Sequence, residues 1–234
     1  MLLESKLLKT NQFNKKNYFK FLNSFKKLGY KFVNFRNIKQ KKNVILRHDV
    51  DFSIDLAKKI AIWDKNLNIS SHFFFQYDSP FYNLLTGKNI DNLKFIKKLN
   101  HKLGFHITIK KESEIKKELS LFSKLLAVHN IKFDNIFSIH KVGSKKQKIN
   151  VSKYKNFYKN KSLKIYYADS GGLFRFGNPL KDKEIVLNKS TFQLNLHPVW
   201  WVSNKNTSKK KKIEATKRLV LNILNDELGS YKLL

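Results

Sequence analysis

Hydrophobic residues along the chain follow two alternating patterns. In one, apolar residues recur every three or four positions, as on the buried face of a helix. In the other, they form short continuous runs rich in β-branched or aromatic residues, which is typical of buried strands. We expect helices at residues 14–28, 54–67, 91–99, 112–128 and 207–228, and strands at residues 31–35, 44–46, 71–76, 103–107, 135–139, 162–168 and 191–196.

The order of these elements predicts the fold class. Strands and helices largely alternate, which favours an α/β fold built on a parallel sheet. The sequence shows no internal repeat, no linker rich in Pro or Gly and no break in composition. We therefore expect residues 1–234 to form a single domain.

The stretch at residues 44–51, V-I-L-R-H-D-V-D, joins a buried strand to a cluster of polar groups. Unpaired charges are costly inside a sheet, so these groups are expected at its carboxyl end, where parallel sheets hold their ligand sites. Side chains two residues apart on a strand share a face, so Asp49 and Asp51 should point the same way. A cation would relieve their repulsion. Alternatively, Asp51 or Ser53 caps the helix that follows.

Other polar residues also fall where strands are expected to end. Because the carboxyl ends of parallel strands meet at one face, these side chains could share a pocket. Histidines scattered through a core would not all fall at that position. The residues concerned are Asp49, Asp51, His106, His140, Asp169 and His197.

Composition limits the chemistry and the location. With no cysteine, the chain has no disulfide, and a metal would have to be held by His, Asp or Glu. No stretch approaches the roughly 20 apolar residues of a membrane span. The first residues lack the apolar run of a signal peptide. We expect a cytoplasmic protein.

The formal net charge of +31 raises the possibility of nucleic-acid binding. The lysines, however, are spread along the whole chain, on the polar faces of the expected helices, and do not form a stripe. The one dense cluster, at residues 209–212, opens the last helix and is interpreted as a solvated face or a weak anion site. We do not expect nucleic acid as a partner.

Six short motifs occur in the order found in a known enzyme family. They are R-H-D-V-D-F-S (47–53), S-P-F-Y-N-L-L (79–85), L-G-F-H (103–106), F-S-I-H (137–140), Y-A-D-S-G-G (167–172) and L-N-L-H-P-V-W-W (194–201). On these motifs, the sequence resembles the polysaccharide deacetylases of carbohydrate esterase family four, in particular the branch with a His-Asp-Val-Asp motif. The resemblance implies a distorted, incomplete (β/α) barrel, as in glycoside hydrolases and deacetylases.

The resemblance also implies roles for individual residues. Asp49 matches the general base and Asp51 a metal ligand, and His106 matches the first histidine of the family's H-[ST]-x-x-H metal motif. The second histidine of that motif is replaced by Lys110, whose ammonium has no lone pair for a metal. Either His140 completes the site or metal binding is weakened or lost; His140 could instead be a hydrogen-bond donor behind the ligands.

The remaining matches predict an acid and a substrate pocket. His197 matches the catalytic acid, which would protonate the departing amine. We expect polar substrate contacts from Arg47 and Asp169. We expect apolar surfaces, on which a sugar ring could stack, from Trp200 and Trp201.

The resemblance thus predicts a metal-dependent hydrolase that removes an acyl group from an N-acylated sugar, with zinc as the expected divalent metal. We expect a role in surface-polysaccharide biosynthesis and a carbohydrate substrate that is free, nucleotide-linked or lipid-linked. Because of Lys110, a catalytically inactive or repurposed protein with the same fold is the alternative, and a basic nucleic-acid-binding protein is a third.

Overall fold

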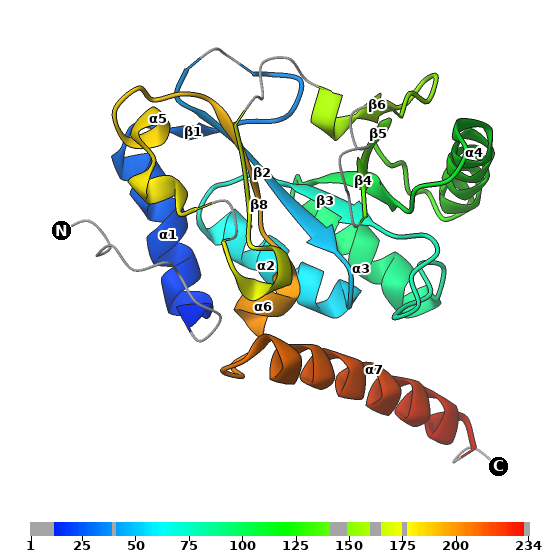
Figure 1. Cartoon of the computed structure of the whole chain (residues 1–234). Coiled ribbons are helices and arrows are strands. Elements are labelled where there is room, and N and C mark those ends of the chain that lie inside the picture. The colour runs from blue at the N-terminus through cyan, green and yellow to red at the C-terminus, as the bar shows by residue number, and fades with distance from the viewer. Residues whose placement is uncertain (1–11, 39–40, 141–148, 160–164, 175–176, 232–234) are drawn as a thin grey trace.

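A computed structural model describes residues 12–38, 41–140, 149–159, 165–174 and 177–231 of the chain. Within these ranges, the strands form one parallel sheet of eight strands in the order β6-β5-β4-β3-β2-β8-β7, with β1 beside β2. The sheet curls into a half-barrel with helices on its outer side (Figure 1). The expected incomplete (β/α) barrel is confirmed.

The strands are β1 (Lys31–Phe32), β2 (Asn43–Val50), β3 (His72–Phe75), β4 (Lys102–Ile107), β5 (Ile136–Ile139), β6 (Lys155–Asn156), β7 (Ile165–Ala168) and β8 (Phe192–Asn195). The α-helices are α1 (Lys15–Lys27), α2 (Ile54–Asn66), α3 (Gly87–Lys98), α4 (Glu112–Val128), α5 (Lys183–Val186), α6 (Pro198–Val202) and α7 (Ser208–Tyr231). Short 3₁₀ helices are formed by Phe157–Lys159, Ser170–Gly172 and Pro179–Lys181.

The first long helices form where local sequence favours them. The side chain of Asn14 caps α1, and Gly29 follows with φ of 84°, a left-handed conformation that glycine adopts without strain. Ser53 caps α2 by accepting a hydrogen bond from the Leu56 amide. The capping alternative for the acidic stretch is therefore correct for Ser53 and leaves Asp51 free for another role.

The central strand, β2, is longer than the sequence pattern predicts. It does not end at Leu46 but continues through Val50, and all eight of its residues are buried. Arg47 and Asp49 lie on the inner side of the half-barrel, and His48 lies on the side covered by α2. The strand tolerates these polar groups because each of them is paired, as described below.

Apolar side chains pack on both sides of the sheet. The larger cluster joins the outer side of the sheet to the helices. A smaller cluster fills the inner side and consists of Phe35, Ile45, Phe74, Ile136 and Phe157. The Arg47 side chain rests against this inner cluster, with its guanidinium carbon 5.5 Å from the centre of the Phe74 ring and 5.6 Å from that of Phe157.

Several elements differ from the expected ones. Residues 198–202, for which the sequence pattern predicted no element, form the short helix α6 with Pro198 in its first turn. Strand β6 and helix α5 were not anticipated, since each is too short to show a periodic pattern. Residues 162–164 of one expected strand lie outside the described residues. Among the helices that the structure describes, none has the length and apolar character needed to cross a bilayer.

Candidate metal and catalytic site

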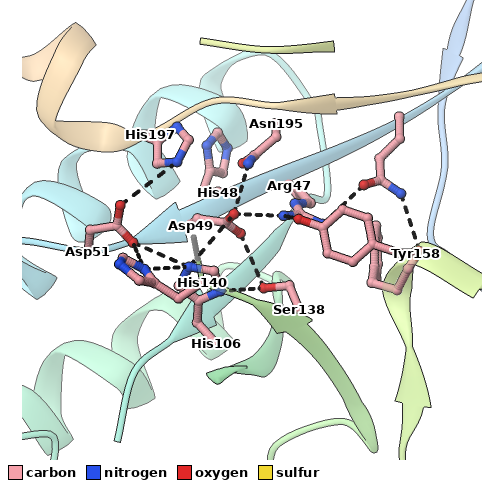
Figure 2. A network of polar contacts seen from close by, with 12 residues as sticks. Arg47, His48, Asp49, Asp51, His106, Ser138, His140, Tyr158, Asn195 and His197 are labelled. Carbon is pink, nitrogen blue, oxygen red and sulfur yellow. Dashed lines mark hydrogen bonds and ion pairs between the residues drawn. The ribbon is translucent and has the colours of Figure 1, made fainter. Parts of the chain in front are cut away.

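Three potential metal ligands meet at the carboxyl ends of neighbouring strands. Asp51 follows β2, His106 lies near the end of β4, and His140 follows β5. One ligand atom from each residue lies within 4.8 Å of the other two (Figure 2). Strand β5 pairs with β4, and β4 is separated from β2 by β3 alone. All three potential ligands therefore come from strands within one stretch of the same sheet. The expected convergence of Asp51, His106 and His140 is therefore present in the structure.

The atoms of this triad suit a divalent metal. Asp51 Oδ1 is buried, accepts no hydrogen bond within the described chain, and lies 3.3 Å from both His106 Nε2 and His140 Nδ1. The other nitrogen of His106, Nδ1, is hydrogen-bonded to Ser138 Oγ at 2.7 Å, which directs Nε2 toward the triad. One carboxylate and two imidazoles are ligands that zinc accepts. The residues present thus fit the metal that the sequence motifs imply.

Lys110 does not enter this triad. Its Nζ donates a hydrogen bond to Glu118 at 2.9 Å and lies 3.5 Å from Asp78. These two carboxylates raise the pKa of Lys110, the Glu118 hydrogen bond most of all, so the ammonium stays charged and paired. His140, at the end of the next strand, is instead the third member of the group of potential ligands with Asp51 and His106.

The Asp49 carboxylate lies beside the triad in a set of hydrogen bonds. Its Oδ2 accepts hydrogen bonds from Arg47 Nη2 at 2.7 Å and from Asn195 Nδ2 at 2.8 Å, and it lies 3.9 Å from His106 Nε2. Burial alone raises the pKa of a carboxyl group, but the Arg47 charge, with smaller contributions from His106 and His197, outweighs burial and lowers the pKa of Asp49. The carboxylate is therefore ionised at neutral pH.

Three residues of this network were missed at the sequence level. Ser138 bridges His106 and Asp49, with its Oγ 3.4 Å from Asp49 Oδ1, and Asn195 holds Asp49 from β8. Gln76 Nε2 lies 2.5 Å from His140 Nδ1. Ser138 and Asn195 each precede a motif histidine by two residues, so the two-residue period of a strand could have identified them. Nothing in the local sequence marks Gln76.

His197 lies across the site from Asp49 and is held by Asp169. Its Nδ1 is 2.6 Å from Asp169 Oδ1, its backbone amide donates to the same carboxylate, and its Nε2 lies 3.9 Å from Asp51 Oδ2. Burial by itself lowers the pKa of His197, but Asp169, helped by Asp51 and Asp49, outweighs it and raises the pKa to about 9. His197 is thus protonated at neutral pH and presents Nε2 to the site.

Two of the expected substrate contacts, Arg47 and Asp169, are buried in supporting positions. Arg47 is fully buried and donates to Asp49, Gln193 and Tyr158, so it positions the carboxylate and has no surface for a substrate. Asp169 is fully buried between His197 and the indole N–H of Trp201. Both are corrected from substrate contacts to positioning residues, because each is fully buried and Arg47 Nη1 and Nη2 and both Asp169 oxygens are hydrogen-bonded to protein groups.

The two tryptophans also differ from expectation. Trp201 is fully buried and stacks on Phe13 with ring centres 4.4 Å apart, which makes it a core residue and not a sugar platform. Trp200 is almost fully buried as well, but its Nε1 has no hydrogen-bond partner within the described chain, and Lys212 lies over its ring. Both tryptophans belong to the short helix α6, and both are among its buried residues.

A second buried network supports β2 from its outer side. Asp64 of α2 accepts hydrogen bonds from Tyr18 at 2.5 Å and Ser71 at 2.6 Å, and it pairs with His48 at 2.8 Å. The other nitrogen of His48 contacts the Leu196 carbonyl. His48 is therefore hydrogen-bonded on both ring nitrogens behind the site, and this network fixes β2 against α2.

The comparisons with known proteins show the fold. No model of a known protein family matches this sequence, and no curated protein matches it. Among solved structures, the chain is similar to the chitin deacetylase of the fungal pathogen Colletotrichum lindemuthianum, with a TM-score of 0.50 and 12% identity over 78% of this chain and 85% of that one.

Two further solved structures are a family 4 carbohydrate esterase from Bacillus anthracis (TM-score 0.43, 15% identity, 87% of this chain and 86% of that one) and a pseudoenzyme of the same family from the same organism (TM-score 0.48, 15% identity, 76% and 61%). At such identities, likeness identifies a fold, and activity has to be argued from the site. The curled parallel sheet described above, together with the likeness to the chitin deacetylase, shows that the chain has the fold of the polysaccharide deacetylases.

Proposed function

We propose that this protein is a metal-dependent hydrolase that removes an acyl group from an N-acylated sugar. The observation that carries the proposal is the meeting of Asp51, His106 and His140 with Asp49 on one side and His197 on the other (Figure 2). These five side chains come from four different strands, so no local structural requirement explains why they converge.

Asp51, His106 and His140 would hold the metal. A divalent ion at this place supplies positive charge that lowers the pKa of a water and stabilises the oxyanion of an acyl-transfer reaction. Ser138 fixes the orientation of His106 through Nδ1, the nitrogen that does not face the triad. Gln76 contacts His140 at Nδ1, the nitrogen that faces Asp51, so a metal held by Nδ1 would replace this contact.

Asp49 is suited to act as the general base. Its carboxylate is ionised, and the hydrogen bonds from Arg47 and Asn195 both go to Oδ2. Oδ1 has only the long contact of 3.4 Å with Ser138. Oδ1 is therefore the oxygen that is available to take a proton from the attacking water.

His197 is suited to act as the general acid. Its pKa of about 9 keeps a proton on the imidazole at neutral pH, and Asp169 holds Nδ1 so that Nε2 faces the site. A base that is ionised and an acid that is protonated at the same pH are the two states that amide hydrolysis requires.

A cavity lined in part by the segments that follow β2 and β3 is relevant to the choice of substrate. It has a volume of about 1260 Å³ and is lined by Ser53 and Tyr77, which lie close along the chain to Asp51 and Gln76. Three lysines and several apolar side chains also line it: Lys58, Lys59, Lys88, Ile54, Ile62, Pro80 and Phe81. We propose a sugar whose anionic or apolar appendage occupies this cavity, as in a nucleotide-linked or lipid-linked sugar of surface-polysaccharide biosynthesis.

The proposal is tested first by metal content. The purified chain is loaded with zinc, cobalt or manganese, dialysed and measured by elemental analysis, together with His106→Ala and the exposed control His129→Ala. We expect close to one metal per chain in the parent protein and in His129→Ala, and loss in His106→Ala. Absence of metal from the parent chain under all three conditions would identify a non-hydrolytic relative.

Acetate release from a panel of N-acetylated sugars, free, nucleotide-linked and lipid-linked, then tests the chemistry. Asp49→Asn should bind metal as the parent chain does while losing hydrolysis, because it removes the proton acceptor and no ligand. Unchanged turnover in Asp49→Asn would show that Asp49 is not the general base.

A further inference from the structure

The long C-terminal helix, α7 (Ser208–Tyr231), carries an apolar stripe that faces away from the body. Ile213, Val220 and Leu224 are 43%, 49% and 49% exposed. Their spacing of seven and four residues places them on one side of the helix. In Figure 1 the last turns of α7 stand clear of the other elements. Within the described residues, nothing covers this stripe.

The opposite side of the same helix is fixed to the body. Lys211 is fully buried, and its Nζ donates hydrogen bonds to the backbone carbonyls of Phe13, Trp200 and Ser203. Ala215, one turn further on, is buried as well. Lys211 therefore belongs to neither the solvated face nor the anion site expected for residues 209–212; it attaches α7 to the body. This attachment determines which side of α7 faces outward.

Positive charges border the apolar stripe. The side chains of Lys209, Lys210, Lys212 and Lys217 are exposed, and the helix carries six Lys or Arg residues against three Asp or Glu. Helix α4 provides a comparison, because it also exposes apolar residues such as Leu121 and Val128. In α4, however, three glutamates balance three lysines. Of these two helices, α7 is the one in which an exposed apolar stripe coincides with a net positive charge.

We propose that α7 binds an anionic lipid bilayer, lying in the plane of its surface with Ile213, Val220 and Leu224 inserted among the acyl chains. Helices that combine an apolar side with flanking lysines bind such surfaces through buried apolar area and through attraction to acidic headgroups. A second copy of this chain is a poor occupant, since a chain of net charge +31 repels another. Nucleic acid would satisfy the lysines but leave the apolar stripe in water.

Helix α7 also lines the cavity that we propose for the substrate appendage. Ala215 and Leu221 of α7 line the cavity that also contains Ser53, two residues after Asp51. A bilayer bound by α7 therefore lies beside the cavity. The inference does not depend on hydrolysis, because lipid binding is measured without metal or sugar, and either proposal can fail alone.

Cosedimentation with vesicles tests the proposal. The parent chain should bind phosphatidylglycerol vesicles and not phosphatidylcholine vesicles. The double variant Val220→Asp, Leu224→Asp should bind the acidic vesicles at least about tenfold more weakly, because it removes apolar insertion. Its control is Leu121→Asp, Val128→Asp on α4, which changes the net charge equally and should bind within about twofold of the parent chain. If both double variants lose affinity equally, the net charge of the chain explains vesicle binding, and the proposal is overturned.

A labelled chain gives a second readout that does not depend on a destabilising substitution. Because the sequence has no cysteine, Leu224→Cys and Val128→Cys each provide one labelling site for an environment-sensitive dye such as NBD. On phosphatidylglycerol vesicles, the dye at position 224 should shift to shorter wavelength and gain intensity, and the dye at position 128 should not. Unchanged emission at position 224 on vesicles that bind the chain would show that the stripe does not insert.

Discussion

Arg47 Nη2 donates a hydrogen bond to Asp49 Oδ2 across 2.7 Å, although both residues belong to one strand and are buried. The two side chains share a face because they are two residues apart. The guanidinium also contacts the hydroxyl of Tyr158 and the amide of Gln193, so its direction is fixed by three partners. Among the neighbouring charges that lower the pKa of the buried Asp49, that of Arg47 has the largest effect.

Removal of Arg47 should therefore destabilise the fold through Asp49. We expect Arg47→Met to lower the free energy of unfolding by about 3–5 kcal/mol, because it leaves a buried carboxylate without its ionic partner. Adding Asp49→Asn to that variant should restore part of the loss, since no buried charge then remains. Urea unfolding of the two single variants and the double variant measures this coupling, and strictly additive losses would argue against it.

Substitution of the third ligand should weaken metal binding where substitution of Lys110 does not. His140→Ala removes one of the three ligand atoms and should lower zinc affinity by at least about 100-fold. Lys110→Ala removes an ammonium that pairs with Glu118 and Asp78 and should leave zinc affinity within a few-fold of the parent value. Competition with a zinc-binding dye measures both affinities. Zinc affinity in His140→Ala equal to that of the parent chain would show that His140 is not a metal ligand.

Asp169 should affect turnover and not metal binding. Asp169→Asn keeps the size of the side chain but removes the charge that raises the pKa of His197. We expect turnover to fall by about 10²-fold at pH 7, the lower end of the usual contribution of a general acid, with zinc affinity unchanged. Initial rates with the sugar found in the acetate-release screen, together with zinc titration, distinguish the two effects. A variant with normal turnover would show that His197 acts without its buried partner.

His72 should contribute to loss of stability in acid. Burial lowers the pKa of His72 to about 3, and its Nε2 accepts a hydrogen bond from the Phe35 amide at 3.2 Å. The unfolded chain, where histidine titrates near 6.5, then binds a proton that the folded chain does not. The stability that neutral His72 provides is present above about pH 6.5 and is lost as the pH falls toward 3.

Comparison with His72→Gln isolates this residue, because glutamine can still accept the Phe35 hydrogen bond but does not titrate. Between pH 6 and 4, the free energy of unfolding of the parent chain should fall more steeply than that of the variant. The difference in slope should approach about 1.4 kcal/mol per pH unit, the value for one proton. Parallel pH profiles would show that His72 is protonated in the folded chain.

Most of the fold could be read from the sequence because its elements are long enough to show a period. The helices at α1, α2 and α4 and the strand β2 were recognisable from apolar spacing alone. Short elements such as α6 span less than two turns and have no period, so only the packed structure reveals them. Trp200 and Trp201 both belong to α6, so their burial could not be predicted without it.

The sequence by itself determined which residue types stand at the ends of the parallel strands, and hence that Asp51, His106 and His140 could meet. The spacing of apolar residues and the order of elements along the chain can both be read directly from the sequence. Only the tertiary structure decided that His140 lies beside Asp51 and His106 while Lys110 pairs with Glu118, that Arg47 is buried against Asp49, and that Lys211 of α7 is buried against the body. Those outcomes depend on the distance between side chains from separate elements and on what surrounds each charge, which no spacing along the chain specifies.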